Sequence, residues 1–377
     1  MKVREFADKI KELGIQTVTG IPDSALKPFC DYMNTQGNRL FRHYVPANEG
    51  AAVGIAIGSY LATGHPSCIY AQNSGLGNMV NPLTSLAAGE VYAVPLLLII
   101  GWRGMPGIAD EPQHKFMGQI TTDMLDVLGI GYDILTPELS ATQVADMFER
   151  TETVLNNGKS HAFVIAGDFL ETEDSCRYQN AYTLSREQAV REIVSGVKDE
   201  DILVATTGKI SRELYEQCNA VKGHHRQAFF TVGGMGHASM IAFAIAAEKP
   251  DRRVWCLDGD GALMMHMGSL AFLGRQKPDN LVHVCLNNEA HESVGGMPAG
   301  SAGLDHVQTA ISCGYPAAYR AETVQELGKL LADIHSRRVL TFLEADVSIG
   351  SRPDLCRPLE TPLENRVRFM QHVGGRK

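Results

Sequence analysis

Basic residues are in the minority in this sequence. Lys and Arg total 34 against 43 Asp and Glu, so the formal net charge is −9 at pH 7. A nucleic-acid-binding surface needs a concentrated positive field. The charge balance therefore predicts no nucleic-acid partner.

Long hydrophobic runs are missing as well. No stretch of 18 uncharged apolar residues occurs, and the run PLLLIIGW at 95–102 is far too short to span a bilayer. Residues 1–14 are amphipathic and contain acids, which favours a first helix over a signal peptide. We therefore expect a cytoplasmic protein with no membrane partner.

Closely spaced cysteine pairs are also absent. The eight cysteines are scattered and form no CxxC pair. Several of them, including Cys68, Cys256 and Cys285, lie inside apolar runs. Cysteines in such positions are expected to be reduced core thiols of a cytoplasmic protein.

What the sequence does contain is a regular alternation of strand-like and helix-like segments. Its 377 residues, 44% of them hydrophobic, are enough for two domains. In the first half, apolar runs alternate with helical patterns near 23–35, 49–63, 76–89 and 140–156, which predicts a parallel sheet covered on both faces. The expected strands are QTVTGI (16–21), FRHYV (41–45), SCIYAQ (67–72), VPLLLII (94–100) and HAFVIAG (161–167).

The second half repeats this plan after a polar, turn-rich stretch at 168–185. We expect an α/β domain at 1–170, a linker at 171–184 and a second α/β domain at 185–377, both with doubly wound parallel sheets. The expected strands of the second domain are DILVATT (201–207), QAFFTV (227–232), RRVWCLDG (252–259), LVHVCLNN (281–288) and VLTFLEADV (339–347).

Two of these strand-like runs end in oxygen-bearing side chains. Asp260 stands between Gly259 and Gly261 after the first run, and 25 residues separate Gly261 from the pair Asn287–Asn288 that ends the next run. In doubly wound sheets, ligands bind beyond the carboxyl ends of the strands. Oxygen donors without His or Cys suit Mg²⁺ or Ca²⁺, and the glycines allow a phosphate to approach the backbone. Gly-Asp-Gly or Asn-Asn alone is more typical of a tight turn, but the two motifs together indicate a metal–phosphate site.

The GDG…NN pattern resembles the cofactor motif of thiamine-diphosphate-dependent decarboxylases and synthases. This resemblance implies that Asp260, Asn288 and the carbonyl of Ala290 bind Mg²⁺, which carries the diphosphate. It also implies a pyrimidine-binding first domain and a diphosphate-binding second domain of the thiamine-diphosphate-binding fold. Only a short polar linker stands where larger relatives have a middle domain.

Glu49 opens an almost wholly apolar helical segment in VPANEGAAVGIAIGSYLATG (45–64). A glutamate in a first helical turn is ordinarily explained by the helix dipole, but entry into so apolar a segment predicts burial and a raised pKa. Glu49 resembles the family's glutamate, which hydrogen-bonds N1′ of the aminopyrimidine so that the proton can leave C2 of the thiazolium.

Met235 precedes the last glycine of the Gly-rich stretch in TVGGMGHASMIAFAIA (231–246). It resembles the bulky apolar residue that bends the cofactor in this family, although ordinary core packing remains the alternative. The segment TTGKIS (206–211) lacks the earlier glycine of an ATPase phosphate loop and is expected to cap a helix facing the diphosphate or the substrate. The expected cofactor-binding residues are Glu49, Asn73, Thr207, Gly208, Gly234, Met235, Gly236, Gly259, Asp260, Gly261, Ala262 and Asn288.

Five further segments, spread over nearly the whole chain, carry a narrower resemblance: GIPDSALKPF (20–29), AQNSGLGNMVNPLTSL (71–86), GWRGMPGIADEPQHKFMG (101–118), TTGKISREL (206–214) and LNNEAHESVGGM (286–297). Together they resemble the phosphonopyruvate decarboxylase family. This resemblance implies decarboxylation of 3-phosphonopyruvate to phosphonoacetaldehyde and CO₂, as part of phosphonate biosynthesis. Sulfopyruvate decarboxylation, carboligation and, less readily, diphosphate binding by a non-catalytic regulator remain alternatives.

Substrate chemistry is expected in the DEPQHK loop (110–115), which follows a buried strand. Related decarboxylases place proton-transferring histidines in the corresponding loop, which makes His114 the candidate, whereas without the resemblance a solvated charge cluster is the alternative. The candidate catalytic residues are Glu49, His114, Asp110, Glu111, His291 and Ser24. The candidate cations for the phosphonate dianion are Lys209, Arg103 and Lys115, and the sequence does not rank them.

Two chains are expected to share each cofactor. Glu49 belongs to the first half, while Asp260 and Asn288 belong to the second. In relatives, the halves that bind one cofactor come from different subunits. The resemblance therefore implies a homodimer as the minimum unit, with a small-molecule substrate as its other partner.

Overall fold

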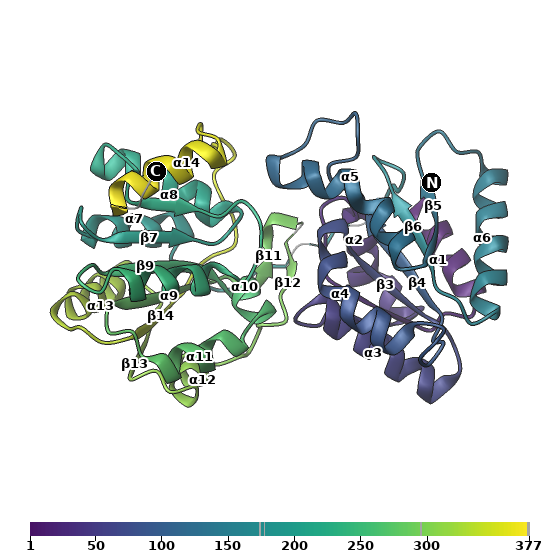
Figure 1. Cartoon of the computed structure of the whole chain (residues 1–377), viewed down its shortest axis with the longest axis horizontal. Coiled ribbons are helices and arrows are strands. Elements are labelled where there is room, and N and C mark those ends of the chain that lie inside the picture. The colour runs from purple at the N-terminus through teal and green to yellow at the C-terminus, as the bar shows by residue number, and fades with distance from the viewer. Residues whose placement is uncertain (173–174, 177, 295, 375–377) are drawn as a thin grey trace. The chain divides into compact units, whose positions relative to one another are not determined.

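The structure is a computed structural model of the whole chain and describes residues 1–172, 175–176, 178–294 and 296–374 (Figure 1). It divides into two compact units. Unit 1 comprises Met1–Arg177 and Ser293–Met297, and unit 2 comprises Tyr178–Glu292 and Pro298–Lys377. The two doubly wound parallel α/β sheets expected from the sequence are confirmed, one in each unit.

Unit 1 is built on a six-stranded sheet with the order β2-β1-β3-β4-β6-β5. Every neighbouring pair of strands runs parallel, so each connection is a crossover. The strands are β1 (Thr17–Gly20), β2 (Arg42–Tyr44), β3 (Ser67–Gln72), β4 (Leu96–Gly101), β5 (Gly131–Leu135) and β6 (His161–Ile165).

Helices cover both faces of this sheet (Figure 1). Successive side chains of a strand point to opposite faces, so β4 feeds two cores. Leu97 and Ile99 pack with α1, α2 and α6, whereas Leu96, Leu98 and Ile100 pack with α3, α4 and α5. The helical segments are α1 (Val3–Glu12), α2 (Lys27–Thr35), η1 (Gly37–Arg39), α3 (Glu49–Thr63), η2 (Asn73–Gly75), α4 (Leu76–Pro82), the π-turn η3 (Leu83–Ala87), α5 (Pro112–Val127) and α6 (Ala141–Asn156).

Unit 2 holds a second six-stranded parallel sheet with the order β13-β14-β10-β9-β7-β8. Its central strands β9 and β10 are buried along their whole length. The strands are β7 (Ile202–Ala205), β8 (Ala228–Phe230), β9 (Val254–Gly259), β10 (Leu281–Asn287), β13 (Ala317–Ala321) and β14 (Thr341–Asp346), and the short strands β11 (Ala290–His291) and β12 (Met297–Pro298) follow β10.

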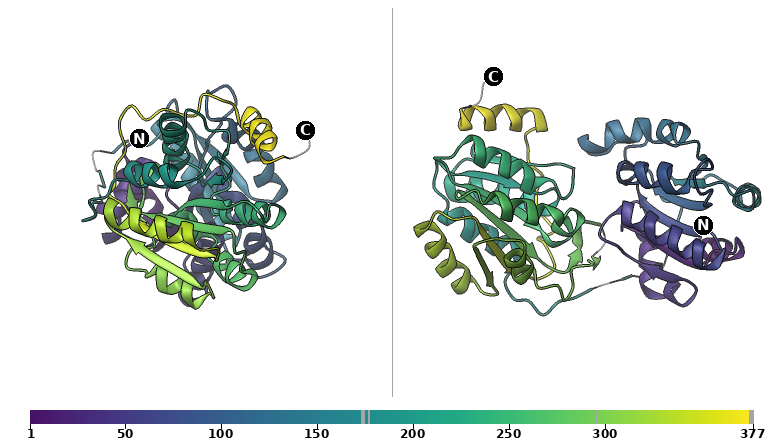
Figure 2. Two further views of the ribbon diagram at one scale, coloured as in Figure 1. Left: turned by 90° about the vertical axis from the view of Figure 1, so that its left-hand side faces the viewer. Right: turned by 60° about the horizontal axis from the view of Figure 1, so that its bottom comes forward.

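Two cores flank this sheet as well. Leu203 and Ala205 of β7 pack with α7, α8 and α13, while Ile202 and Val204 pack with α9, α11 and α12. The C-terminal helix α14 is the yellow helix near the C-terminus in Figure 2. It packs beside β8, where the ring of Phe369 contacts that of Phe229. The helices are α7 (Arg186–Gly196), α8 (Lys209–Lys222), α9 (Ala238–Glu248), α10 (Asp260–Met265), α11 (Gly268–Gln276), η4 (Glu292–Val294), α12 (His306–Ser312), α13 (Val324–Ser336) and α14 (Pro362–Val373).

Several elements were not predicted from the sequence, among them two strands of the six-stranded sheets and the helix α5. β5 and β13 are edge strands, and most of their residues are only half-buried, so neither gives the apolar run of a central strand. The expected loop at 110–115 is partly helical, because α5 begins at Pro112 with proline at its first position.

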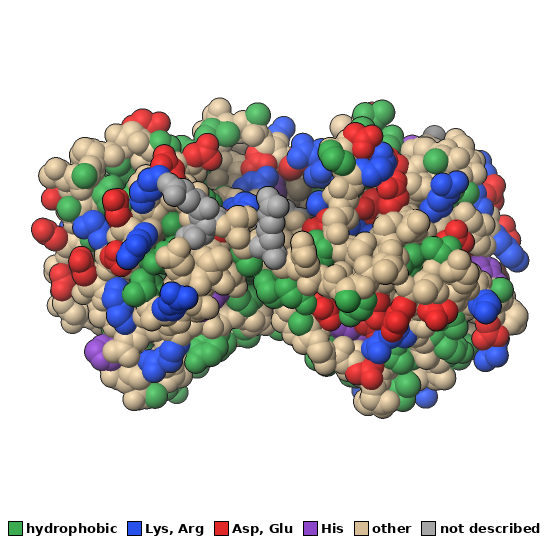
Figure 3. Space-filling view, turned by 180° about the vertical axis from the view of Figure 1, so that it is seen from behind, with side chains coloured by type: hydrophobic (Ala, Val, Ile, Leu, Met, Phe, Trp, Pro, Cys, Tyr) green, Lys and Arg blue, Asp and Glu red, His purple; other side chains and the backbone are tan. Residues whose placement is uncertain are grey.

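The surface carries charges of both signs on each unit, as the face in Figure 3 shows. Among the described residues, no helix combines the length and the apolar character needed to cross a membrane.

Candidate active site

In unit 2, Asp260 begins α10 at the point where β9 ends. The neighbouring strand β10 pairs Leu286 with Gly259, so the residues that follow β10 emerge beside the turn that carries Asp260. Asp260 is only 3% exposed, and Ser301 Oγ donates to its Oδ2 at 2.7 Å. Burial raises the pKa of Asp260 to about 6, although hydrogen bonds from Ser301 and the Gly261 backbone act in the opposite direction.

The segment after β10 is held by hydrogen bonds from the chain that enters unit 2. Asn180 Nδ2 donates to the Asn288 carbonyl at 3.0 Å. Tyr178 and Tyr182 donate through their hydroxyls to the two carboxylate oxygens of Glu289, at 2.7 and 3.1 Å. Glu289 itself adopts the left-handed region, with φ of 57°, so these contacts restrain a strained backbone. These hydrogen bonds were not predicted, because no sequence pattern links residues 178–182 to Asn288 and Glu289.

The side chain of Asn288 is buried and fully oriented. Its Oδ1 accepts from the Ala290 N–H at 3.1 Å, and its Nδ2 donates to Glu292 Oε2 at 2.9 Å. Ala290, whose carbonyl is the third expected metal ligand, is also buried. The amide oxygen of Asn288 is therefore the end that lies toward the backbone of Ala290.

The other glycine-rich turns of unit 2 lie near the Gly259–Gly261 turn that carries Asp260. A Cβ added at Gly261 would lie 3.3 Å from the ring of His291 and 3.3 Å from Met235 Cε. One added at Gly259 would lie 3.2 Å from Ile210 in the first turn of α8. Gly208, Gly234 and Gly236 all have positive φ, between 66° and 91°, which favours glycine at these positions. Unit 2 thus brings together Gly259, Gly261, Met235 and His291, and the N-terminus of α8 borders them.

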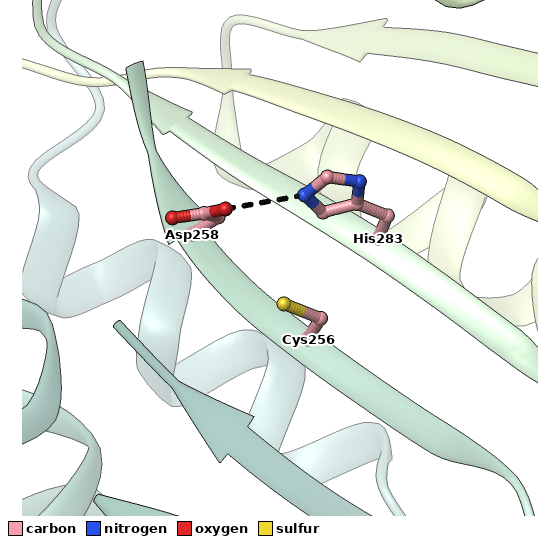
Figure 4. Close-up of side chains that lie close together, drawn as sticks. All are labelled: Cys256, Asp258 and His283. Atoms are coloured by element: carbon pink, nitrogen blue, oxygen red, sulfur yellow. Dashed lines mark hydrogen bonds and ion pairs between the residues drawn. The ribbon is translucent and has the colours of Figure 1, made fainter. Parts of the chain in front are cut away.

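Beneath this turn, a buried cluster of Cys256, Asp258 and His283 places three potential metal-ligand atoms within 4.8 Å of one another (Figure 4). Asp258 Oδ2 lies 3.4 Å from His283 Nε2, and its Oδ1 accepts from the Gly259 N–H at 3.0 Å. His283 Nδ1 lies 3.1 Å from the Tyr315 hydroxyl. Burial raises the pKa of the Cys256 thiol well above its usual value. These contacts satisfy Asp258 and His283 within the protein, so the cluster acts as support for the Gly259–Asp260 turn.

In unit 1, Glu49 lies at the first position of α3, which Asn48 caps by accepting from the Ala51 N–H. Glu49 is 6% exposed, and Asn78 Nδ2 donates to its Oε2 at 2.7 Å. Gly75 leaves room for this carboxyl, since a Cβ there would stand 2.6 Å from Glu49 Oε1. Burial raises the pKa of Glu49, as its apolar surroundings in the sequence suggested.

A charged cluster follows β4 of unit 1. Arg103 Nε donates to Asp110 Oδ2 at 2.8 Å, Nη2 to Oδ1 at 2.5 Å, and Nη1 to Ser24 Oγ at 2.7 Å. The bidentate hydrogen bond from Arg103 holds the pKa of Asp110 well below its usual range. Three residues that the sequence singled out separately, Ser24, Arg103 and Asp110, are therefore in direct contact.

His114 and Glu111 lie at the start of α5, beside this cluster. Glu111 is the N-cap residue, and its N–H donates to Asp110 Oδ1 at 2.7 Å. His114 is in the first turn, and partial burial followed by the nearby Arg103 charge lowers its pKa, so the neutral imidazole is favoured. Lys115 is exposed.

Comparison with known proteins identifies the family. Residues 2–127 match the thiamine pyrophosphate enzyme N-terminal TPP binding domain, and residues 207–345 match the C-terminal TPP binding domain. The chain belongs to the thiamine pyrophosphate (thiamine diphosphate) enzyme family.

Two relatives cover nearly the whole chain of this thiamine diphosphate enzyme. It is 34% identical to phosphonopyruvate decarboxylase of Streptomyces viridochromogenes over 96% of this chain and 92% of the relative. It is 33% identical to phosphonopyruvate decarboxylase of Streptomyces hygroscopicus, over 95% of this chain and 90% of the relative. Sulfopyruvate decarboxylase of Methanosarcina acetivorans is 25% identical, over 98% of this chain and 96% of the relative.

The donor set in unit 2 of this family member fits a magnesium ion. Asp260 offers a buried carboxylate, and in the described part of the chain no Lys or Arg forms an ion pair with it. Together with the amide of Asn288 and the carbonyl of Ala290, it would provide hard oxygen ligands, which Mg²⁺ prefers. A buried acid that lacks a cationic partner is costly unless a cation is supplied.

Two further buried polar residues lie beyond the ends of strands in unit 1. Asn73, an expected cofactor ligand, donates through Nδ2 to the Arg103 carbonyl and to Thr121 Oγ1, both at 2.8 Å, and so joins η2 to α5. Asp23 was not predicted, yet it is fully buried at the end of β1 and accepts from Gln72 Nε2 at 2.5 Å. Its position after a strand is the signal that could have found it.

Proposed function

We propose that this protein decarboxylates 3-phosphonopyruvate to phosphonoacetaldehyde and CO₂, using thiamine diphosphate and Mg²⁺, in phosphonate biosynthesis. The observation that carries the proposal is the buried oxygen-donor set of Asp260, Asn288 and Ala290 in a chain related along its whole length to two phosphonopyruvate decarboxylases. Under this proposal Asp260, Asn288 and the Ala290 carbonyl bind Mg²⁺.

When bound, thiamine diphosphate supplies the electron sink that allows CO₂ to leave. Glu49 is proposed to hydrogen-bond the aminopyrimidine ring, and its raised pKa suits a group that shares a proton with a ring nitrogen. Met235 is proposed to support the bent cofactor, because it lies against the Gly259–Gly261 turn. The remaining cofactor contacts proposed are Asn73, Thr207, Gly208, Gly234, Gly236 and Ala262.

The cluster around Arg103 is proposed to handle the substrate. Arg103 is held by Asp110 and Ser24, which fixes the direction of its planar guanidinium. His114 is neutral at pH 7 by the direction of its pKa shift, so it can accept a proton or orient the carboxylate. Burial lowers the pKa of His291 to about 4, and this residue is proposed to act as a neutral hydrogen-bonding group.

A homodimer is proposed as the minimum unit, with one cofactor shared between the first half of one chain and the second half of the other. The proposal is supported by family membership, and the complementation experiment discussed below tests it. A cytoplasmic location is also proposed, since all eight cysteines are free.

The direct test is CO₂ release. Purified protein supplied with 3-phosphonopyruvate, thiamine diphosphate and Mg²⁺ should release CO₂, and EDTA should abolish the activity. Omission of thiamine diphosphate is the matched control. No release above the EDTA level with fully loaded protein would reject the function.

Sulfopyruvate decarboxylation is the second candidate, because the Methanosarcina acetivorans relative covers 98% of the chain. Both substrates present a keto group beside a carboxylate and a tetrahedral anion, so the same residues could act on either. Values of kcat/KM for the two substrates under identical conditions decide between them. A larger value for sulfopyruvate would overturn the phosphonate assignment.

A further inference from the structure

Glu292 connects the expected metal ligand Asn288 to two cations of unit 2. Its Oε2 accepts from Asn288 Nδ2 at 2.9 Å and from Arg186 Nη1, and its Oε1 accepts from Lys209 Nζ at 2.7 Å. Arg186 is 4% exposed and also binds Glu213, through Nε at 2.7 Å and Nη2 at 2.9 Å. Glu292 therefore has three partners: Arg186, the first residue of α7, Lys209, the first residue of α8, and Asn288.

This arrangement determines which end of the Asn288 amide faces the metal. An amide has one end that donates hydrogen bonds and another that accepts them, and rotation by half a turn exchanges the two. A carboxylate paired with two cations only accepts, so Glu292 selects the NH₂ end of Asn288. The oxygen is then left on the opposite side, where it accepts from the Ala290 N–H at 3.1 Å.

Lys209, one of the candidate cations for the phosphonate, donates from Nζ to Glu292 Oε1 at 2.7 Å. Its ammonium has further N–H donors, but the Glu292 side chain is only 8% exposed and depends on this partner. A buried carboxylate that loses a partner carries a desolvation cost. The ion pair thus favours Lys209 as a residue that holds Glu292.

We propose that Glu292 is a positioning residue that sets the orientation of the Asn288 amide and thereby the Mg²⁺ affinity of unit 2. This inference rests on the proposed function, since it needs a thiamine diphosphate–Mg²⁺ site in unit 2. Partners of metal ligands that fix ligand orientation change metal affinity roughly 10- to 100-fold when removed. Glu292 acts through Asn288 and touches neither metal nor substrate in this scheme.

The first test compares two glutamates with similar partners. Glu292→Gln should weaken Mg²⁺ binding roughly tenfold or more in calorimetric titrations with saturating thiamine diphosphate, because a glutamine amide no longer dictates the orientation of Asn288. Glu360→Gln is the matched control, since Glu360 also binds an arginine (Arg368) and an asparagine amide (Asn365 Nδ2, 2.9 Å). Asn365 binds the backbone of Ala228 and Phe230 instead of a metal-binding segment, so this control should leave the Mg²⁺ affinity unchanged.

Thermal unfolding without cofactor separates positioning from general destabilisation. Both variants lose a charged partner of a buried or half-buried arginine, so both should lower Tm. Only Glu292→Gln should also change the Mg²⁺ Kd. Glu292→Asp, which keeps the charge but is shorter by one methylene, is the second variant if Glu292→Gln fails to fold, and it should weaken Mg²⁺ binding in the same direction.

The sharper test replaces Asn288 by aspartate, whose side chain ends in two equivalent oxygens. A carboxylate presents an oxygen at either end, so in an Asn288→Asp background the orientation no longer matters. Glu292→Gln should then cause no loss of Mg²⁺ affinity, although it causes one in the wild-type background. An equal loss in both backgrounds would refute the positioning role. Absence of Mg²⁺–thiamine diphosphate binding by the wild-type protein would instead refute the proposed function.

Discussion

The surroundings of two buried carboxyl groups, Asp260 in unit 2 and Glu49 in unit 1 of this thiamine diphosphate enzyme, differ. Asp260 of unit 2 stands at the end of a central strand, close to the segment that carries an amide and a carbonyl oxygen. Glu49 of unit 1 begins an apolar helix and has an amide N–H donor, Asn78, as its side-chain partner. Burial raises the pKa of both. The buried Asp260 carboxylate therefore lacks a compensating cation, and the buried Glu49 carboxyl favours its protonated form.

The difference teaches how one fold, used twice, provides two kinds of chemistry. At the strand ends of unit 2, glycines and neutral donors leave the charge of Asp260 uncompensated, which suits metal binding. At the strand ends of unit 1, Arg103 and Asp110 compensate each other, whereas Glu49 at the start of α3 has a raised pKa and an amide as its side-chain partner. The predictions below test this division of labour.

The largest effect is expected from combining one lesion in each unit. Glu49→Gln and Asp260→Ala chains should each be nearly inactive, because each lacks one of the two carboxyl groups. If one cofactor is shared between chains, a mixed dimer carries both lesions in one site and none in the other. Refolding the two chains together should restore about a quarter of the sites, since half of randomly formed dimers are mixed. Activity per mixed dimer, with subunit exchange measured by mass, is the readout.

The opposite outcome of that experiment is equally informative. If each chain built a complete site from its own two units, every site in a mixed dimer would still carry one lesion. Demonstrably mixed dimers without recovered activity would therefore reject the shared site. Two Glu49→Gln chains with different tags, refolded together, give the residual activity of dimers in which no site is intact.

Loss of the Asp260 carboxylate, the proposed charged metal ligand, should alone strongly weaken cofactor binding. Asp260→Ala removes the charged ligand, and the cost of breaking a buried charge interaction is about 3–5 kcal/mol, or more than about 100-fold in affinity. Asn288→Ala should act in the same direction but less, because a neutral ligand is lost. Calorimetry with thiamine diphosphate and Mg²⁺ measures both. Wild-type affinity in Asp260→Ala would remove unit 2 from the metal assignment.

Much of this division could be predicted from the sequence because its signals are local. Asp260 and Asn288 were placed together from two apolar runs ending in oxygen donors, since parallel central strands end at the same edge of a sheet. The burial of Glu49 was predicted from the apolar residues that follow it. Central strands were found for the same reason, as they are buried on both faces.

What the sequence did not reveal depends on contacts between distant residues or on weak patterns. Glu292 meets Arg186 across 106 positions, and no spacing rule predicts such a pair. Tyr178 reaches Glu289 across 111 positions. The edge strands β5 and β13 lack an apolar run, and Asp23 lies in a segment read as a helix. Asp23 had a usable local signal in its position after a strand, whereas the other omissions depend on tertiary contacts or on patterns too weak to recognise locally.

A change in unit 1 near the substrate cluster should affect turnover without affecting the cofactor. His114→Ala should lower kcat by about 100-fold, the lower range for loss of a proton-transferring group, and leave thiamine diphosphate affinity unchanged. His114→Gln, which keeps a hydrogen-bonding side chain, separates proton transfer from orientation. An unchanged kcat from pH 6 to 8 in His114→Ala would assign the residue to the surface of α5 instead.

The smallest effect concerns the stability of the cofactor-free protein, and it distinguishes the two buried carboxyl groups most directly. Because burial raises the pKa of Glu49 above 4.5, the folded state favours the protonated form. The stability that this proton provides is fully present below the unfolded-state pKa and is lost as the pH rises through the folded-state pKa. Glu49→Gln has no such loss, and its amide oxygen can still accept from Asn78. At pH 8 this variant should therefore be more stable than wild type by ~1 kcal/mol, the size of an ordinary single substitution, and the difference should shrink toward pH 4.5. Urea unfolding at several pH values measures this difference in stability.

Without cofactor, Asp260→Asn should show the same pH dependence relative to wild type. When Mg²⁺ and thiamine diphosphate are added, only wild type and Glu49→Gln should gain stability, because only they keep the Asp260 carboxylate that is proposed to bind the metal. A pH-independent difference between Glu49→Gln and wild type would show that the Glu49 carboxyl is not forced toward its neutral form, and the contrast between the two units would then be lost.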